Sequence, residues 1–434
     1  MKLLIAALLA QCVFAQSPEH WVSTWATSPQ QPRAFPPRPP APPAAGATTP
    51  APPTPPAPPR PQPITSFHNQ TLRMIAHTSI GGRRARIELS NVFGSAPLGI
   101  GSAHIAMRDQ ESGIVASSDR ALLFGGRPGC WIPPGGTVVS DAVNLDVPAA
   151  SDLAVSIYIP ETATADTMHA VGLHTTYISK AGDATAASAI TDATTTQSFY
   201  FLTNVDVAAP PNAAAIVTFG DSITDGAVST PNTDRSWPSF LARRLAASGA
   251  ANIAVLNQGI SGNRLLRDGA GVNALARFDR DVLVQPGVKW LVILEGINDI
   301  GLGLRADAAA SDAVSADDLI AALQQLIERA HEHGIKVIGG TLTPFEGAAY
   351  YSEAGETVRM AVNQWIRASS NGAGAFDAVV DFDAATRDPD QPKQFRAGFN
   401  NGDHLHPNDA GYRAMADAID LSIFGLKPIT TAAK

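Results

Sequence analysis

Residues 214–222 read AAIVTFGDS, an apolar run that closes on Gly220, Asp221 and Ser222. After it, apolar runs alternate with amphipathic stretches of helical period. The apolar runs are NIAVLNQGI (252–260), KWLVILEGIND (289–299), IKVIGGTLT (335–343) and AFDAVVDFD (375–383), and the helical stretches are 237–247, 274–283, 315–334, 358–370 and 408–422. This alternation predicts an α/β domain whose parallel sheet is covered by helices on both faces. The functional groups of such sheets lie at the carboxyl ends of the strands.

Ser222 follows directly on the end of the first strand-like run, where Gly220 permits a sharp turn. A serine becomes a nucleophile only when a base removes its proton and hydrogen-bond donors stabilise the oxyanion. A serine after Gly-Asp more often caps a helix or a turn. The tripeptide alone leaves both interpretations open.

Two further strand ends carry groups that can donate hydrogen bonds. Residues 257–263 read NQGISGN, in which the N–H of Gly262 is a candidate donor to an oxyanion. Taken alone, however, this block is better explained as a turn in which glycine supplies a positive φ. Residues 296–299 read GIND, and the amide of Asn298 is a second candidate donor. Asn-Asp after a strand is equally ordinary turn chemistry.

Residues 403–407 read DHLHP, just before the last helical stretch. The spacing lets the carboxylate of Asp403 hold one nitrogen of His406 while the other nitrogen faces a serine. Metal binding by His404 and His406 is the alternative. No second cluster of ligand spacing accompanies these histidines, so no metal site is predicted.

Taken in this order, the four blocks resemble those of the GDSL/SGNH hydrolases, a family of serine esterases and lipases. The resemblance covers residues 214–422 and implies a flavodoxin-like domain that needs no cofactor. It also implies Ser222 as nucleophile, with Asp403 and His406 completing a catalytic triad. The absence of a Gly-x-Ser-x-Gly motif argues against the ordinary α/β-hydrolase fold.

The same resemblance implies an oxyanion hole made by the backbone N–H groups of Ser222 and Gly262 and the side chain of Asn298. Glu295, directly before Gly296, departs from the family pattern. A carboxylate at that position would influence the choice of acyl group.

Residues 68–205 consist of short alternating segments broken by Gly, Pro and Asp, which predict an antiparallel β-sandwich. The stretches WVSTWATSP, TLRMIAHTSIGG and LSNVFG are similar to the β-rich extension of some bacterial GDSL hydrolases.

A Pro/Ala-rich run at 29–63 holds half of the 34 prolines. We expect it to be an extended or disordered loop inserted in this domain. The expected organisation is a signal peptide at 1–15, a β-sandwich domain at 16–208, a hydrolase domain at 209–426 and a tail at 427–434.

The first residues, MKLLIAALLAQCVFAQ, have the layout of a signal peptide that is cleaved after Ala15. We therefore expect a secreted or periplasmic protein; the alternative is a buried N-terminal helix. Cys130 is then the one remaining cysteine, so no internal disulfide can form. A net charge of −8 argues against nucleic acid as a partner. No other apolar run approaches membrane-spanning length, so no stable membrane insertion is expected.

The expected activity is hydrolysis of carboxylic esters, either small molecules or acyl groups on a polysaccharide, through an acyl-enzyme. A broad-specificity carboxylesterase or lipase and an acyltransferase with the same triad remain alternatives. A non-catalytic glycan-binding protein on a hydrolase fold is the alternative from another class. The presence of all four polar residues, Ser222, Asn298, Asp403 and His406, speaks against it. The sequence does not fix the oligomeric state.

Overall fold

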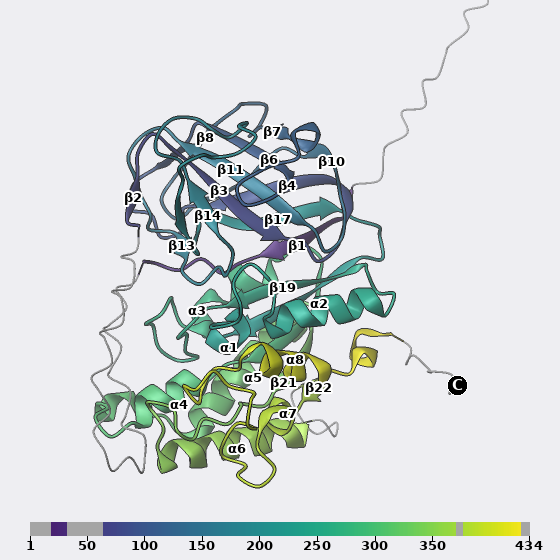
Figure 1. Ribbon diagram of the computed structural model, residues 1–434. Coiled ribbons are helices and arrows are strands. Elements are labelled where there is room, and N and C mark those ends of the chain that lie inside the picture. Colours follow the sequence, from purple (N-terminus) through teal and green to yellow (C-terminus); the bar gives the residue numbers. More distant parts are fainter. Residues whose placement is uncertain (1–18, 33–63, 370–375, 427–434) are drawn as a thin grey trace, which may run out of the picture.

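The computed structural model describes residues 19–32, 64–369 and 376–426, which form a β-rich part and an α/β part (Figure 1). The last strand of the β-rich part ends at Ala208, and the first strand of the parallel sheet begins at Ala214. The predicted signal peptide, the C-terminal tail and residues 33–63 of the Pro/Ala-rich run lie outside the described residues. Pro29 and Gln30, at the start of that run, are buried, and the backbone of Gln30 exchanges hydrogen bonds with that of Met168 as an isolated β-bridge.

The α/β part is built on a five-stranded sheet in the order β19-β18-β20-β21-β22. All neighbouring strands are parallel. In chain order this is 2-1-3-4-5, the flavodoxin-like arrangement that the family resemblance implied. Its strands are β18 (Ala214–Gly220), β19 (Ile253–Gly259), β20 (Val288–Leu294), β21 (Lys336–Gly340) and β22 (Ala378–Val380). Every residue of β18 is buried, which requires that both faces of the sheet are covered.

The helices that cover this sheet are α1 (Ser222–Asp225), α2 (Trp237–Ala247), α3 (Ala274–Phe278), α4 (Ile297–Leu304), α5 (Ala316–Glu332), α6 (Glu353–Ser369), α7 (Phe382–Thr386) and α8 (Asp409–Asp417). Helix α5 is capped by Ser315, which forms a capping box with Asp318. The stretch 375–383 was predicted to be one strand, but its end is helical. Asp381 caps α7 by accepting a hydrogen bond from the N–H of Ala384, so the strand stops at Val380.

The β-rich part contains two antiparallel sheets and three short strand pairs. The first sheet consists of β1 (Trp21–Ala26), β17 (Leu202–Ala208), β4 (Gly82–Ser90), β10 (Val143–Val147) and β9 (Thr137–Val139). The second consists of β15 (Thr194–Thr196), β14 (Thr176–Ile178), β3 (Gln70–His77), β11 (Asp152–Ile159), β6 (Ser102–Met107) and β7 (Arg120–Leu122). The short pairs are β2 (Ser66–Phe67) with β12 (Ala163–Thr164), β13 (Met168–His169) with β16 (Phe199–Tyr200), and β5 (Leu98–Ile100) with β8 (Cys130–Ile132).

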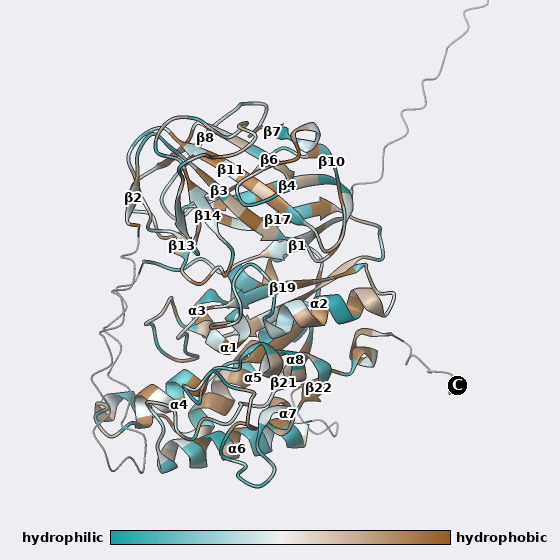
Figure 2. Ribbon diagram, in the orientation of Figure 1, coloured by the Kyte–Doolittle hydropathy of each residue, from teal (hydrophilic) through white to brown (hydrophobic). Residues whose placement is uncertain are grey.

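The two parts share one hydrophobic core. Buried apolar side chains run from Leu72 and Val155 in the β-rich part to Val217 and Leu291 in the parallel sheet as one contiguous cluster. Figure 2 shows hydrophobic residues along the strands of both parts, while the peripheral helices carry both kinds of residue. Strand β1 lies against β19, the edge strand of the parallel sheet. None of the described helices is long and apolar enough to cross a membrane.

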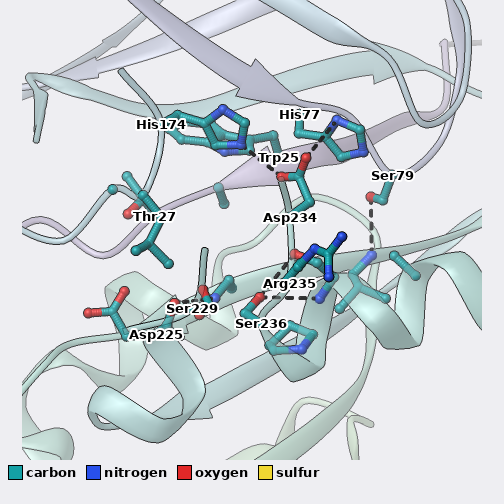
Figure 3. Close-up of a pocket in the computed structure, with 18 of the residues that line it drawn as sticks. Trp25, Thr27, His77, Ser79, His174, Asp225, Ser229, Asp234, Arg235 and Ser236 are labelled. Atoms are coloured by element: carbon teal, nitrogen blue, oxygen red, sulfur yellow. Dashed lines mark hydrogen bonds and ion pairs between the residues drawn. The ribbon is translucent and has the colours of Figure 1, made fainter. Parts of the chain in front are cut away.

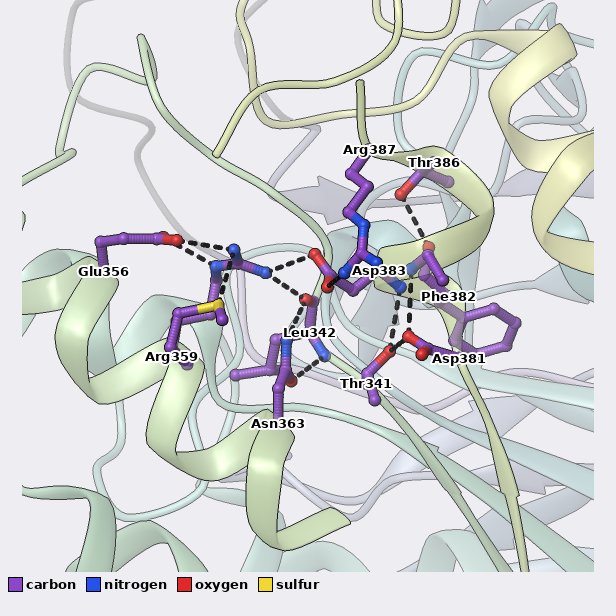
Figure 4. Close-up of polar contacts among 12 residues, drawn as sticks. Thr341, Leu342, Glu356, Arg359, Asn363, Asp381, Phe382, Asp383, Thr386 and Arg387 are labelled. Atoms are coloured by element: carbon purple, nitrogen blue, oxygen red, sulfur yellow. Dashed lines mark hydrogen bonds and ion pairs between the residues drawn. The ribbon is translucent and has the colours of Figure 1, made fainter. Parts of the chain in front are cut away.

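A buried polar network holds α6 to α7 (Figure 4). The guanidinium of Arg359 donates to both carboxylate oxygens of Glu356, at 2.8 and 2.7 Å, and to Asp383 at 2.8 Å. The second oxygen of Asp383 accepts from Arg367 at 2.6 Å and from Arg387 at 2.9 Å. Asp383 is 1% exposed and pairs with all three arginines, so its carboxylate, together with Glu356, compensates the charge of Arg359 inside the protein.

We expect Asp383→Ala to lower the free energy of unfolding by about 3–5 kcal/mol, since it leaves the charge of Arg359 buried with one partner fewer. Asp417→Ala is the control, because Asp417 is 54% exposed and forms surface ion pairs with Arg413 on α8 and Arg244 on α2, and such pairs contribute about 0–1 kcal/mol. Urea unfolding of both variants measures the difference. Equal losses of stability in the two variants would contradict the assigned role of Asp383.

Candidate active site

Ser222 opens α1 immediately after β18 ends. Asp221 caps this helix by accepting a 2.9 Å hydrogen bond from the N–H of Ile223. A Cβ atom at Gly220 would lie 2.2 Å from the carbonyl oxygen of Leu294 in β20. Position 220 therefore requires glycine because β18 and β20 approach each other closely there. The sharp turn that the sequence suggested does not explain the glycine. The packing places Ser222, which is 5% exposed, at the carboxyl end of the central strand.

His406 joins Ser222 to Asp403. Its Nε2 lies 2.7 Å from the Oγ of Ser222, and its Nδ1 lies 2.7 Å from the Oδ2 of Asp403. The other oxygen of Asp403 accepts from the backbone N–H groups of Leu405 and His406. Burial alone would raise the pKa of Asp403, but the hydrogen bond from His406 and these N–H groups hold it well below its usual value. An ionised Asp403 fixes the tautomer of His406 that can accept the proton of Ser222.

His404, the competing histidine, is exposed and has a φ of 60°. Its ring lies against Gly347, and the contacts with Ser222 and Asp403 belong to His406. The metal site that the sequence raised as an alternative for His404 and His406 therefore has no support in the geometry.

The three predicted oxyanion donors lie at the ends of β18, β19 and β20. Gly262 has a φ of 84°, so its block is the glycine turn that the sequence allowed. Among the described residues, neither the N–H of Ser222 nor that of Gly262 donates to a protein acceptor. The Nδ2 of Asn298 donates one hydrogen to the carbonyl oxygen of Asn263 at 2.9 Å. Its second amide hydrogen is therefore left for another acceptor.

A model of a known protein family matches the α/β part. Residues 218–414 match the model of the GDSL-like lipase/acylhydrolase family, and every residue named above for the triad and the oxyanion donors falls inside that range. The α/β part is a GDSL/SGNH hydrolase domain. The protein is an ester hydrolase.

The following solved structures are similar to about half of this chain. An acetylxylan esterase from Geobacillus stearothermophilus is 23% identical, with a TM-score of 0.37, over 49% of this chain and 95% of its own. A GDSL-like lipase from Bacteroides thetaiotaomicron is 20% identical, with a TM-score of 0.36, over 49% and 88%. An α/β hydrolase from the metagenome of Lake Arreo is 21% identical, with a TM-score of 0.38, over 49% and 97%. The curated proteins contain no match to the sequence.

Arg277 is a residue of the hydrolase domain that the sequence analysis missed. Its buried guanidinium donates to the carbonyl oxygen of Gly220 at 2.9 Å and to that of Gln258 at 2.7 Å. Its Nε donates to the Oδ1 of Asn263 at 2.8 Å. Because Asn263 in turn holds Asn298, one side chain ties together the ends of the three strands that carry the site. An arginine fifteen residues beyond the Gly262 block gives no sequence signal of this contact.

The β-rich part also reaches the site. His169, in β13, contacts the Oδ1 of Asp225 at 3.1 Å, and Asp225 is the last residue of α1. The Oδ2 of Asp225 accepts from the N–H and the Oγ of Ser261, at 2.9 and 2.6 Å. Burial would lower the pKa of His169, but the charge of Asp225 raises it on balance. His169 thus supports both the helix that starts with Ser222 and the turn that contains Gly262.

Three buried carboxyl groups lie under the site. Burial raises the pKa of Asp221 to about 7 and that of Asp299 to about 6. Burial, together with the nearby Asp221, also raises the pKa of Glu295 well above its usual value. The side chain of Glu295 is completely buried, 3.7 Å from Arg277. The expectation that Glu295 influences acyl-group choice is therefore wrong, because it faces Arg277 in the interior and cannot contact a substrate.

Tyr350 fixes the orientation of Asn298. Its hydroxyl donates to the Oδ1 of Asn298 at 3.2 Å, so the amide nitrogen must point the other way, toward Asn263 and the site.

We expect Tyr350→Phe to lower kcat roughly fivefold with little change in KM, because the loss of the hydrogen bond that positions Asn298 costs about 1 kcal/mol of transition-state stabilisation.

Tyr351→Phe is the matched control, because the neighbouring hydroxyl donates to the exposed Glu353. Steady-state kinetics on p-nitrophenyl acetate measures both variants. Loss of activity in Tyr351→Phe equal to that in Tyr350→Phe would show that the effect does not pass through Asn298.

Proposed function

We propose that this ester hydrolase is a secreted enzyme that works through a covalent acyl-enzyme on Ser222, with His406 as general base and Asp403 as its partner. The observation that carries the proposal is the unbroken contact chain from Ser222 through His406 to Asp403, with 2.7 Å at each step. A non-catalytic binding protein would have no use for this alignment.

In the first half of the reaction, His406 takes the proton of the Ser222 hydroxyl as the oxygen attacks the ester carbonyl. The tetrahedral intermediate collapses when His406 gives that proton to the leaving alcohol. In the second half, water replaces the alcohol and repeats the sequence, which frees the acid and Ser222. Asp403 stays ionised throughout and stabilises the imidazolium.

The oxyanion of each intermediate is stabilised by the N–H groups of Ser222 and Gly262 and by the free amide hydrogen of Asn298. Each such donor contributes on the order of 3 kcal/mol to the transition state. These donors stabilise the transition state only if they are already in position when the charge develops. The hydrogen bonds of Arg277, Asn263 and Tyr350 hold them in that position.

As substrate we propose acyl groups on polysaccharides, supported by the leader-like N-terminus and by a β-rich domain that contacts the catalytic helix. The test is a panel of p-nitrophenyl esters of increasing chain length beside acetylated xylan and pectin. Release of acetate from the polymers supports this substrate. Preference for long-chain esters would indicate a lipase, and transfer to an added alcohol in place of water would indicate an acyltransferase.

We expect Ser222→Ala and His406→Ala each to abolish turnover of p-nitrophenyl acetate while circular dichroism and the thermal midpoint stay close to wild type. The two residues act as a unit, so the losses should be similar. His404→Ala is the matched control and should keep most of the activity, since its ring is exposed and contacts neither partner. Wild-type turnover by Ser222→Ala would contradict the mechanism.

Export has its own test. We expect the mature protein to begin at Gln16, because small residues precede a cut after Ala15. Intact mass of protein recovered from the periplasm or medium of a bacterial host measures the N-terminus. Protein that accumulates inside the cell with Met1 and the apolar run still attached would overturn the proposal.

A further inference from the structure

A cavity of about 200 Å³ lies between the β-rich part and the hydrolase domain, lined on the hydrolase side by residues of α1, α2 and the segment between them (Figure 3). Three side chains converge in this region: His77 at the end of β3, Asp152 at the start of β11, and Asp234 between α1 and α2. One ligand atom from each lies within 4.8 Å of the other two. Two of these residues belong to the β-rich part, and the third belongs to the hydrolase domain.

The hydrogen bonds within this cluster are incomplete. The Nδ1 of His77 lies 2.7 Å from the Oδ1 of Asp152 and 3.4 Å from the Oδ2 of Asp234. A neutral imidazole has one N–H, which serves only one of these two oxygens. Among the described residues no other N–H or O–H donates to the Oδ2 of Asp234. The cluster therefore presents a carboxylate oxygen, of a side chain 16% exposed, that lacks a protein donor.

The outer oxygens of both carboxylates are held by separate donors. Arg108 donates to the Oδ2 of Asp152 at 2.8 Å, and the Nε2 of His174 lies 2.7 Å from the Oδ1 of Asp234. Figure 3 shows Asp234 between His77 and His174. Partners of this kind around metal sites orient the ligating carboxylates. They leave the inner oxygens directed at the space beside His77.

We propose that His77, Asp152 and Asp234 bind a divalent cation of the zinc class, with water completing the coordination. Zinc ligands at 2.0–2.2 Å in a tetrahedron are separated by about 3.4 Å, and the Nδ1–Oδ2 distance already has this value. The contact between the Nδ1 of His77 and the Oδ1 of Asp152, now 2.7 Å, must open by roughly 0.7 Å when the Nδ1 proton leaves for solvent. One nitrogen and two oxygens suit Zn²⁺, whereas Ca²⁺ requires six to eight oxygen ligands.

The cation fastens the segment that follows α1 to the β-rich part. Arg243, the second arginine near the cluster, donates to the backbone carbonyl of Asp234 and leaves the inner carboxylate oxygen open. Because the ligands come from both sides of the interface, binding stabilises the assembled fold in proportion to the logarithm of the metal concentration. The ligands lie 75 and 82 residues apart in the chain, so no motif spacing signals this site.

The test is isothermal titration of untagged, EDTA-treated full-length protein with ZnCl₂, beside elemental analysis after dialysis against Zn²⁺. We expect one Zn²⁺ per chain with a Kd of about 1 µM or tighter. Asp234→Asn and His77→Gln should each weaken binding at least roughly tenfold. A matched control is His331→Gln, since His331 contacts Asp377 at 2.9 Å in an exposed pair that lacks a third ligand.

Thermal unfolding with and without Zn²⁺ separates a misfolded variant from one that has lost the site. Wild type and His331→Gln should gain several degrees with Zn²⁺, and the cluster variants should gain none. No saturable binding to wild type, or binding that His77→Gln and Asp234→Asn leave unchanged, would overturn the proposal. A stronger response to Ca²⁺ than to Zn²⁺ would overturn the choice of metal.

Discussion

The geometry of the active site depends on one buried guanidinium. Arg277 is completely buried, lies 3.9 Å from the ring centre of Phe219, and donates to the end of β18 at Gly220 and to Gln258 and Asn263 at the end of β19. Its charge is compensated by Asp281 at 3.0 Å. A buried arginine costs several kcal/mol of desolvation unless its partners are in place. The same desolvation cost disfavours partly formed versions of the site, because the guanidinium has all its hydrogen-bond acceptors only when the strand ends are in their native positions. A lysine lacks the planar guanidinium group and could not donate hydrogen bonds to all of these acceptors at once.

The β-rich part belongs to this arrangement as well. Ser28, just after β1, accepts a hydrogen bond from Arg277 at 3.0 Å and donates to the side chain of Gln258 at 2.6 Å. His169 supports Asp225 from the same side. These contacts, together with the shared apolar core, mean that the hydrolase domain lacks part of its support without the strands that precede it. The N-terminal half therefore helps to position the residues of the active site.

The parts of the molecule that could be predicted from the sequence are those whose signal is local. Apolar runs and helical period are properties of neighbouring residues, and they indicated the sheet, its helices and the polar strand ends. Ser222, Gly262, Asn298, Asp403 and His406 could be named because each sits in a short block with a recognisable pattern. Arg277, Tyr350 and His169 could not, because each acts through a contact with a residue distant in the chain. For Glu295 the sequence was misleading in the opposite way. Its place beside Gly296 suggested a role in substrate choice, but its side chain is buried beside Arg277.

The segment between α1 and α2, residues 226–236, contacts both the β-rich part and the helix that follows His406. It begins beside Asp225, which His169 holds, and it contains Asp234 near its far end. In between, Thr230 donates to both oxygens of Asp409, at 2.9 and 2.7 Å, in the helix that follows His406. The hydroxyl of Tyr412 in the same helix donates to the carbonyl oxygen of Ala227 at 2.8 Å. The serine side and the histidine side of the active site are thus joined through this one segment, and both of its ends are fastened to the β-rich part. A displacement of the β-rich part would therefore change the distance between Ser222 and His406, and with it the ease of proton transfer, without touching either residue.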